Sequence, residues 1–288
     1  MKNLLKKLVL LTLLVSVFAI SCKKDGEGDE EKQGDVTVQL TDAPFPFEFV
    51  AEANISIAKV ELKNSEGNYI TVFEASGGTS VTYNLLDYSN GETANVDTNK
   101  LDIGTYTHAK ITFAGATVKM NGSIYEGEGE DTIFSDLGAS TEGSYEYEIL
   151  PALVVEEGET SNVLIDIDVN GSFSFSSGGL PFGDWINFIT QITSCSFNPE
   201  VRVCDLDHTG VITGEVTVSG EEAENANVTI TKDGKILASH TKSDGSYTFI
   251  GVSSGTYQVS VTVKDEGTIK KDVTVTGTET LHSNFDFL

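Results

Sequence analysis

Apolar and polar residues alternate with a period of two along most of the chain. In the stretch 35–41, valine or leucine occupies every second position. Such alternation is typical of β-strands with one buried face, because successive side chains of a strand point to opposite faces of its sheet. Gly, Asn, Asp and Pro cluster between the alternating stretches, as they do in turns. Strands are therefore expected over 35–41, 53–62, 69–73, 106–113, 116–120 and 163–169, and in the last third of the chain over 211–218, 226–231, 246–249, 257–263 and 271–276.

This pattern predicts an all-β protein with two β-sandwich domains in tandem, preceded by a signal peptide and a disordered tether. The length of 288 residues fits two domains of ordinary size. The expected organisation is a signal peptide over 1–21, a flexible acidic tether over 22–34, an acidic β-sandwich domain over 35–204, a linker over 205–209 and a second β-sandwich over 210–288.

The first residues have the features of an export signal. Three lysines precede an apolar run over 8–20, which is too short for a membrane-spanning helix of about 20 residues. The run ends in Ala19-Ile20-Ser21-Cys22, which resembles the lipobox of bacterial lipoproteins. Cleavage before Cys22 and acylation of its thiol, for example by palmitate, would anchor the chain to a membrane. The alternative is an ordinary signal peptide followed by an incidental cysteine.

Charge bears on location and partners. The stretch 23–33 has no apolar residue and is expected to be a solvated tether, and its acidic run resembles the surface-export signals of some lipoproteins. We therefore expect an outer-membrane lipoprotein displayed on the cell surface, with a periplasm-facing anchor as the alternative. The chain has 44 acidic against 18 basic residues, a net charge of −26, which argues against nucleic acid as a partner.

The last 79 residues contain four short motifs, Gly210-x-Ile212-x-Gly214-x-Val216, Ala226-x-Val228-x-Ile230, Thr241-x-Ser243-Asp244-Gly245-Ser246-Tyr247-x-Phe249 and Gly255-x-Tyr257. With these motifs the segment resembles the carboxypeptidase regulatory-like domain, a family of accessory domains. The resemblance implies a transthyretin-like β-sandwich, often classed with carbohydrate-binding-like folds, and no peptidase activity. Asn225 stands where that family usually has glycine, and asparagine tolerates a positive φ better than most residues.

The preceding domain contains the motifs Val38-x-Leu40-Thr41-Asp42-Ala43-Pro44, Asn84-Leu85-Leu86-x-Tyr88-x-Asn90-Gly91, Gly104-x-Tyr106-x-x-Ala109-x-Ile111 and Phe197-x-Pro199-x-Val201. With these motifs it resembles a family of secreted bacterial domains, domain of unknown function 4382. The resemblance implies an extracytoplasmic β-domain, often found beside carboxypeptidase regulatory-like modules, and it implies no activity.

Several acidic motifs are candidate metal ligands, but each has a simpler interpretation. Asp166-x-Asp168-x-Asn170-Gly171 matches the start of a calcium-binding EF-hand loop, yet position 12 is Ser177 where a bidentate Glu is needed. The alternation around it places both aspartates on the solvent face of a strand. The acidic run 126–131 is expected to be a solvated hairpin tip. Asp42 is expected to cap the turn after its strand.

The remaining reactive residues give no catalytic constellation. The four histidines are scattered, without a cysteine or second histidine at the spacing of a zinc site, and no H-E-x-x-H motif occurs. We predict no enzyme activity, no metal and no cofactor. A disulfide between Cys195 and Cys204 is left open: a hairpin at Pro199 would place them face to face, whereas one extended strand would separate them by ~30 Å.

The segment 172–194 interrupts the β-pattern and concentrates the aromatic residues Phe182, Trp185 and Phe188. Asp184 could N-cap a short helix there. The segment is either a cover over an open edge of the sandwich or a contact surface for a ligand.

Together these features predict a non-enzymatic binding or assembly module, whose partner would be a glycan or another surface protein. The alternatives are a structural spacer, or an accessory subunit of a hydrolase or transporter.

Overall fold

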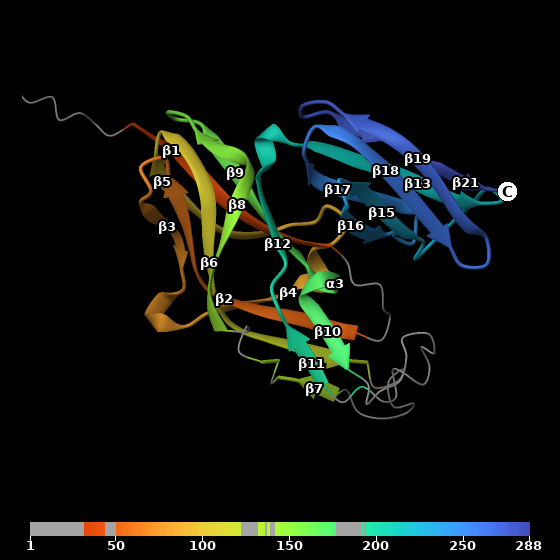
Figure 1. Cartoon of the computed structure of the whole chain (residues 1–288), viewed down its shortest axis with the longest axis horizontal. Helices are drawn as coiled ribbons and strands as arrows, with labels where there is room; N and C mark the ends of the chain where they lie inside the picture. Colours follow the sequence, from red (N-terminus) through yellow and green to blue (C-terminus); the bar gives the residue numbers. More distant parts are fainter. Residues whose placement is uncertain are drawn as a thin grey trace, which may run out of the picture. The chain divides into compact units, whose positions relative to one another are not determined.

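The computed structural model describes residues 32–43, 50–121, 132–135, 137–138, 142–176, 192 and 194–288. The residues from Gln33 onward belong to one compact unit, which holds two β-domains packed against each other (Figure 1). The described elements are almost entirely strands, as the alternation predicted. Among the described residues, no helix has the length and apolar character needed to cross a membrane.

The first domain is built on a ten-stranded sheet whose main path runs β3-β2-β6-β8-β12-β9-β1-β5. Two short strands extend it, because β4 pairs with β2 and β7 pairs with β6. The strands are β1 (Gln33–Ala43), β2 (Val50–Asn64), β3 (Tyr69–Glu74), β4 (Val81–Asn84), β5 (Ala94–Asp102), β6 (Gly104–Met120), β7 (Thr132–Phe134), β8 (Glu142–Val155), β9 (Thr160–Asp168) and β12 (Val201–Asp205).

The sheet folds over into two leaves that face each other. One leaf contains β3, β2, β6 and β8, and the other contains β12, β9, β1 and β5. Between β12 and β8, Val203 and Ile149 form the single strand-paired residue pair among the described residues. At the opposite side, Asn99 of β5 donates a hydrogen bond of 2.6 Å to the carbonyl of Val72 in β3. The inward residues of both leaves form one apolar core, in which the β1 residues Val36, Val38 and Leu40 are fully buried.

A small two-stranded sheet covers one end of this core. It consists of β10 (Phe173–Ser176) and β11 (Ser194–Phe197), and it follows the single helical turn α3 (Val169–Ser172). The ring of Phe197 lies 4.9 Å from that of Phe173 and 5.8 Å from that of Phe113 in β6, centroid to centroid. These buried aromatic contacts attach the small sheet to the core.

The second domain is a sandwich of two sheets around a separate core. One sheet runs β14-β13-β17 with β20 and β21 also paired to β13, and the other runs β16-β15-β18-β19. Tyr247 of β17 is fully buried between them and donates its hydroxyl to the carbonyl of Ser283. The strands are β13 (Gly210–Val218), β14 (Glu221–Glu222), β15 (Asn227–Lys232), β16 (Lys235–His240), β17 (Ser246–Val252), β18 (Gly255–Val263), β19 (Gly267–Val275), β20 (Thr280–His282) and β21 (Phe285–Phe287).

The connection between the domains is short and structured. The stretch expected as a linker consists of the end of β12 and the 3₁₀ turn η4 (Leu206–His208). Asp205 is fully buried there, and its carboxylate accepts hydrogen bonds from the amides of Val154 and Asp207. His208 Nδ1 lies 2.8 Å from the same carboxylate. The connection is therefore packed against the first domain instead of being a free linker.

Most predicted strands are present, with two instructive differences. The two strands expected over 106–113 and 116–120 are one strand, β6, which continues through Gly115 at a φ of 155° and a shift in register against β2. The strand β16 was not predicted, because its sequence does not alternate; it is placed by a tight turn in which Asp233 and Gly234 both have positive φ. Asn225 adopts a φ of 59°, as expected for asparagine in a glycine position.

Candidate functional site at the junction of the two domains

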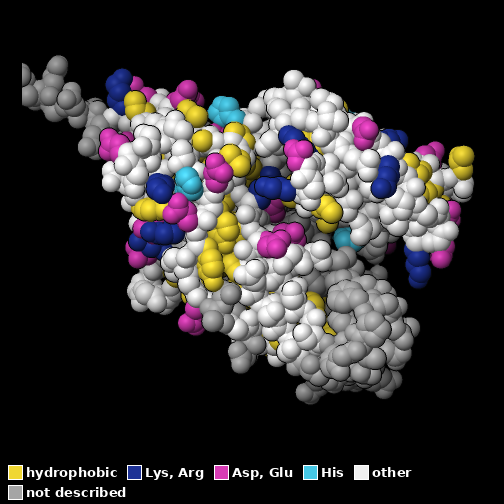
Figure 2. Space-filling view, in the orientation of Figure 1, with side chains coloured by type: hydrophobic (Ala, Val, Ile, Leu, Met, Phe, Trp, Pro, Cys, Tyr) yellow, Lys and Arg dark blue, Asp and Glu magenta, His cyan; other side chains and the backbone are white. Residues whose placement is uncertain are grey.

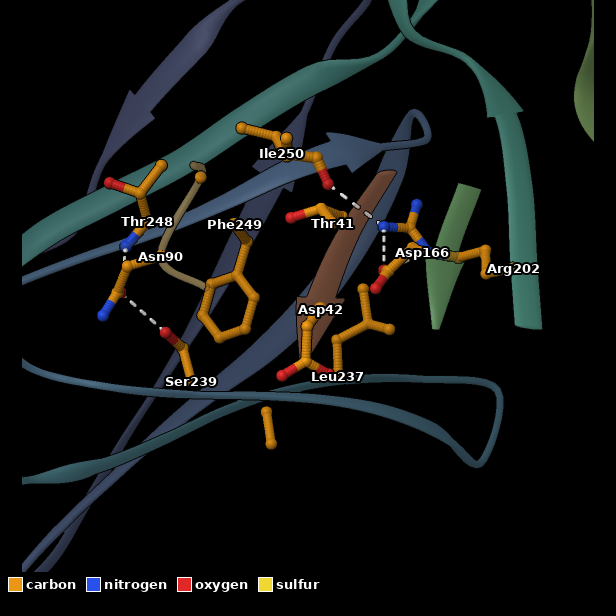
Figure 3. A pocket seen from close by; sticks show the side chains of 12 residues that line it. Thr41, Asp42, Asn90, Asp166, Arg202, Leu237, Ser239, Thr248, Phe249 and Ile250 are labelled. Carbon is orange, nitrogen blue, oxygen red and sulfur yellow. Dashed lines mark hydrogen bonds and ion pairs between the residues drawn. The ribbon is translucent and has the colours of Figure 1, made fainter. Parts of the chain in front are cut away.

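A small pocket lies where the first domain meets the second (Figure 3). From the first domain it is lined by side chains at the end of β1, in β9, in β12 and in the turn after the 3₁₀ segment η2 (Leu85–Tyr88). From the second domain, β16 and β17 complete it. The lining residues are Thr41, Asp42, Asn90, Gly91, Asp166, Arg202, Leu237, Ala238, Ser239, Thr248, Phe249 and Ile250.

Asn90 connects the first domain to two strands of the second. Its Nδ2 donates to the carbonyl of His240 at 2.6 Å, and its Oδ1 accepts from the Ser239 hydroxyl at 2.7 Å and from the Thr248 amide at 3.2 Å. Its backbone is in the left-handed region, with a φ of 57°, which asparagine tolerates better than most residues. The next residue is Gly91, where a Cβ atom would lie only 2.9 Å from the Thr248 side chain. The Asn-Gly pair therefore suits both the turn and the close approach of the second domain.

Arg202 makes a second connection between the domains. Within the first domain its Nε and Nη2 lie 3.1 and 2.6 Å from Asp166 Oδ2. Across the junction, Nη2 donates to the carbonyl of Ile250 at 3.1 Å and Nη1 donates to that of Gly251. One guanidinium thus neutralises a buried carboxylate and satisfies two main-chain carbonyls of the other domain.

The main chain of β17 comes unusually close to the first domain at Gly251. A Cβ atom there would lie 2.9 Å from Cys204 Sγ and 2.9 Å from Leu164 Cδ2, and the φ of Gly251 is 66°. Both the contact and the backbone conformation therefore require glycine. A weaker charged contact, Lys242 to Glu92 at 3.3 Å, lies at the exposed rim.

The junction contains more negative than positive charge. Asp42 is 5% exposed, and its Oδ1 accepts the amide hydrogen of Val169 at 3.2 Å. The turn that it was expected to cap lies outside the described residues. Burial raises the pKa of the Asp42 carboxyl well above its ordinary value, and Asp166 and Asp168 raise it further. Arg202 is the one cation among the residues that line the pocket.

The EF-hand-like motif was expected to be a strand, but it is one only as far as Asp168, because Asn170 and Gly171 lie in the helical turn α3. Asp166 lies in β9 as expected, yet it is 7% exposed and not on a solvent face, because β12 pairs with β9 and brings Arg202 against it. Asp168 ends the strand and caps α3 by accepting the amide hydrogen of Gly171 at 2.9 Å. Across the described residues, no group of three or more His, Cys, Asp or Glu side chains is arranged to hold a metal ion.

The two cysteines are free thiols, so the possible disulfide is not formed. Cys195 lies in β11 of the small sheet and Cys204 in β12 of the large one, and these strands do not pair as a hairpin. Both thiols are buried, which raises the pKa of Cys204 to about 11 and that of Cys195 to about 12. Cys204 is the one of the two that reaches the junction, where its Sγ lies 3.8 Å from the carbonyl of Gly251.

The other predicted site residues fall outside the described part of the chain. These are the lipidation candidate Cys22, the aromatic candidates Phe182, Trp185 and Phe188, and the acidic run 126–131. Sequence reasoning did not single out Arg202 at all. It quoted Asn90 only as part of a motif, and it considered Asp42 as a metal ligand or a turn cap and not as a residue of an interface between domains.

The lysines of the first domain do not form a basic surface. Along β2 and β6 they pair with glutamates, as in Lys110 to Glu61 at 2.7 Å and Lys63 to Glu146 at 3.0 Å. Figure 2 shows acidic and basic side chains side by side over this part of the surface.

The fold and the junction define a class: an all-β protein of two sandwich domains, joined by a polar interface that contains no recognisable catalytic group among the described residues. The chain belongs to the family described as Domain of unknown function (DUF4382), which matches residues 33–179. The Carboxypeptidase regulatory-like domain matches residues 211–287. Both family assignments agree with the resemblances seen in the sequence. Neither description names a catalytic activity.

Solved structures with some similarity, several of them pilins, match at identities too low to transfer a function. The shaft pilin SpaA from Lactobacillus rhamnosus GG is 11% identical, with 89% of this chain and 96% of that chain covered and a TM-score of 0.25. The Bacillus anthracis TIE protein is also 11% identical, with 92% of this chain covered, a TM-score of 0.25, and only 42% of its own length spanned. No curated protein matches the chain.

Proposed function

We propose that the chain is a membrane-anchored, non-enzymatic binding or assembly module whose two β-domains act as one rigid unit. The observation that carries the proposal is the junction. Asn90 and Arg202 together bind five groups of the second domain, namely the carbonyls of His240, Ile250 and Gly251, the hydroxyl of Ser239 and the amide of Thr248. Two domains on a free linker would leave these groups to water.

A rigid junction suits a protein that holds a surface in a defined orientation relative to its anchor. We infer that the anchor is a lipid on Cys22, followed by the acidic tether, and that the protein is displayed at the outer surface of the outer membrane. The short apolar run that ends at Cys22 supports the anchor. The partner would be a glycan or another surface protein, and the aromatic segment around Trp185 is the candidate contact surface.

Two measurements test the anchor and the display. Metabolic labelling with a fatty-acid analogue should mark the wild-type protein and not Cys22→Ala, and the variant should appear in the soluble fraction. Protease added to intact cells should digest the wild-type protein if it faces outward, whereas protection until the outer membrane is opened would indicate a periplasm-facing anchor. Labelling of Cys22→Ala at the wild-type level would contradict the lipid anchor.

A binding module and a spacer differ in their response to ligands. For a binding module, a panel of surface glycans should contain at least one that raises the melting temperature of the purified protein, because a ligand that binds only the folded state stabilises it. The fluorescence of Trp185, the single tryptophan of the chain, should change with the same ligand. No shift with any glycan or surface protein would favour the spacer.

A further inference from the structure

Asp42 is a buried carboxyl group with an incomplete set of partners. Its Oδ1 accepts one amide hydrogen, from Val169, and its Oδ2 has no hydrogen-bond partner among the described residues. An ionised carboxylate normally requires several donors or a paired cation when it is removed from water. One backbone amide does not meet this requirement, so the ionised form of Asp42 is poorly stabilised in the closed junction.

The charged groups around Asp42 make ionisation still less favourable. Asp166 and Asp168 of the adjacent strand β9 both act on it as like charges. The guanidinium of Arg202 is already occupied by Asp166 and by the carbonyls of Ile250 and Gly251. The residues that line the pocket from β16, β17 and the Asn90-Gly91 turn have no titratable side chain.

The second domain contributes to the burial of this group. Leu237 and Ser239 of β16 line the same pocket as Asp42 (Figure 3). The open space in the pocket is about 20 Å³, which is enough for about one water molecule and not for a hydration shell. Movement of β16 away from the first domain would therefore open this pocket and let water hydrate an ionised Asp42.

We propose that Asp42 holds a proton while the two domains are packed together, and that loss of this proton loosens the junction. The protonated carboxyl is neutral and can donate its hydrogen to a single water in the pocket. The ionised carboxylate is repelled by Asp166 and Asp168, and it draws water into the interface. The protein is thus rigid at low pH and gains freedom between its domains as the pH rises.

The direction of the pH effect follows from the raised pKa of Asp42 in the closed form. Between the ordinary aspartate pKa and this raised value, the closed form binds more protons than the open form. The equilibrium constant for closing therefore falls by up to about tenfold per pH unit in that window. The stabilisation is fully present below the ordinary aspartate pKa and is lost as the pH rises through the raised one.

The test compares the wild type with Asp42→Asn, which has nearly the same shape and is neutral at every pH. Backbone ¹⁵N relaxation is measured on the chain from residue 22 onward, with Cys22→Ala in every sample, at pH 5.5 and pH 9. We expect the wild-type domains to tumble with one correlation time at pH 5.5 and with shorter, separate ones at pH 9. Asp42→Asn should keep one correlation time at both values, since it has no proton to lose.

Controls separate this effect from general acid or base effects. Asp272→Asn, an exposed change on β19, should behave like the wild type. His240 is present in all three proteins, so its own titration cancels in the comparison. Equal pH dependence in the wild type and Asp42→Asn would overturn the proposal, as would separate tumbling of Asp42→Asn at pH 5.5.

If Asp42→Asn does not fold, the pH dependence of the carboxyl ¹³C chemical shift of Asp42 in the wild type measures its titration midpoint directly. A titration midpoint clearly above the ordinary aspartate value of about 3.9 would support the proposal. A midpoint at that value would overturn it.

Discussion

Replacing Asn90 should uncouple the two domains more than any other single neutral substitution at the junction. Asn90→Ala removes three hydrogen bonds, to His240, Ser239 and Thr248. At a net contribution of about 0.5–1.5 kcal/mol for each, the loss is about 2–4 kcal/mol. A φ of 57° also costs alanine about 1 kcal/mol, so the expected total loss in the free energy of unfolding is about 3–5 kcal/mol.

The part of this loss that concerns the junction can be measured separately. Asn90→Gly keeps the backbone conformation and removes only the side-chain hydrogen bonds, so it should recover about 1 kcal/mol relative to Asn90→Ala. Asn225→Ala is the matched control, because Asn225 has a similar φ of 59° and lies outside the pocket. It should cost about 1 kcal/mol and leave the domains coupled.

Urea unfolding, followed by circular dichroism, measures these differences. The wild type should unfold in one transition, because each domain stabilises the other through the junction. Asn90→Ala should unfold in two, since once the freed groups are hydrated the domains no longer support each other. A loss for Asn90→Ala no larger than that for Asn225→Ala, with a single transition retained, would refute the importance of Asn90 at the junction.

Two further predictions concern the buried charge and the thiols. Arg202→Met leaves Asp166 buried without its cation and should destabilise the protein by about 3–5 kcal/mol in urea unfolding. The double variant with Asp166→Asn should recover more than half of that loss, and no recovery would contradict the pairing. In the chain with Cys22→Ala, Cys195 and Cys204 should resist alkylation at pH 8 in the folded state, since burial raises both thiol pKa values. In guanidinium both should react within minutes without any reductant, because they are free thiols. Mass spectrometry that finds no label in guanidinium would instead show a disulfide.

Strand content and domain order were predictable because each depends on local patterns. The alternation in β1 follows from one buried face, and the turn residues Asp233 and Gly234 follow from the positive φ of a tight hairpin. The position of β16 depends on its partner β15 and on the facing domain, so its own residues carry little signal. The continuous strand β6 was divided in the prediction because Gly115 looks like a break, whereas it is a shift in register within one strand.

The junction was not predictable from the sequence in the same way. Asp166 alternates with apolar neighbours exactly as an exposed strand residue does, and only the pairing of β9 with β12 shows that Arg202 covers it. Cys204 and Gly251 approach each other although they lie 47 positions apart in the chain. Contacts of this kind depend on how two complete domains meet, and the residues involved have no periodicity that could reveal it.

The polar character of the junction explains how two soluble domains can pack in one orientation. An apolar interface would be tolerant of sliding and would leave adhesive surfaces on each domain whenever it opened. Here each hydrogen bond of Asn90 and Arg202 requires a particular carbonyl, hydroxyl or amide of β16 or β17, so a displaced arrangement leaves buried groups without partners. Gly91 and Gly251 permit the approach on opposite sides of the interface, and any Cβ at either position would separate the domains. Orientation is thus determined mainly by polar groups and close backbone contacts, with a few apolar side chains such as Leu164 and Leu237 beside them.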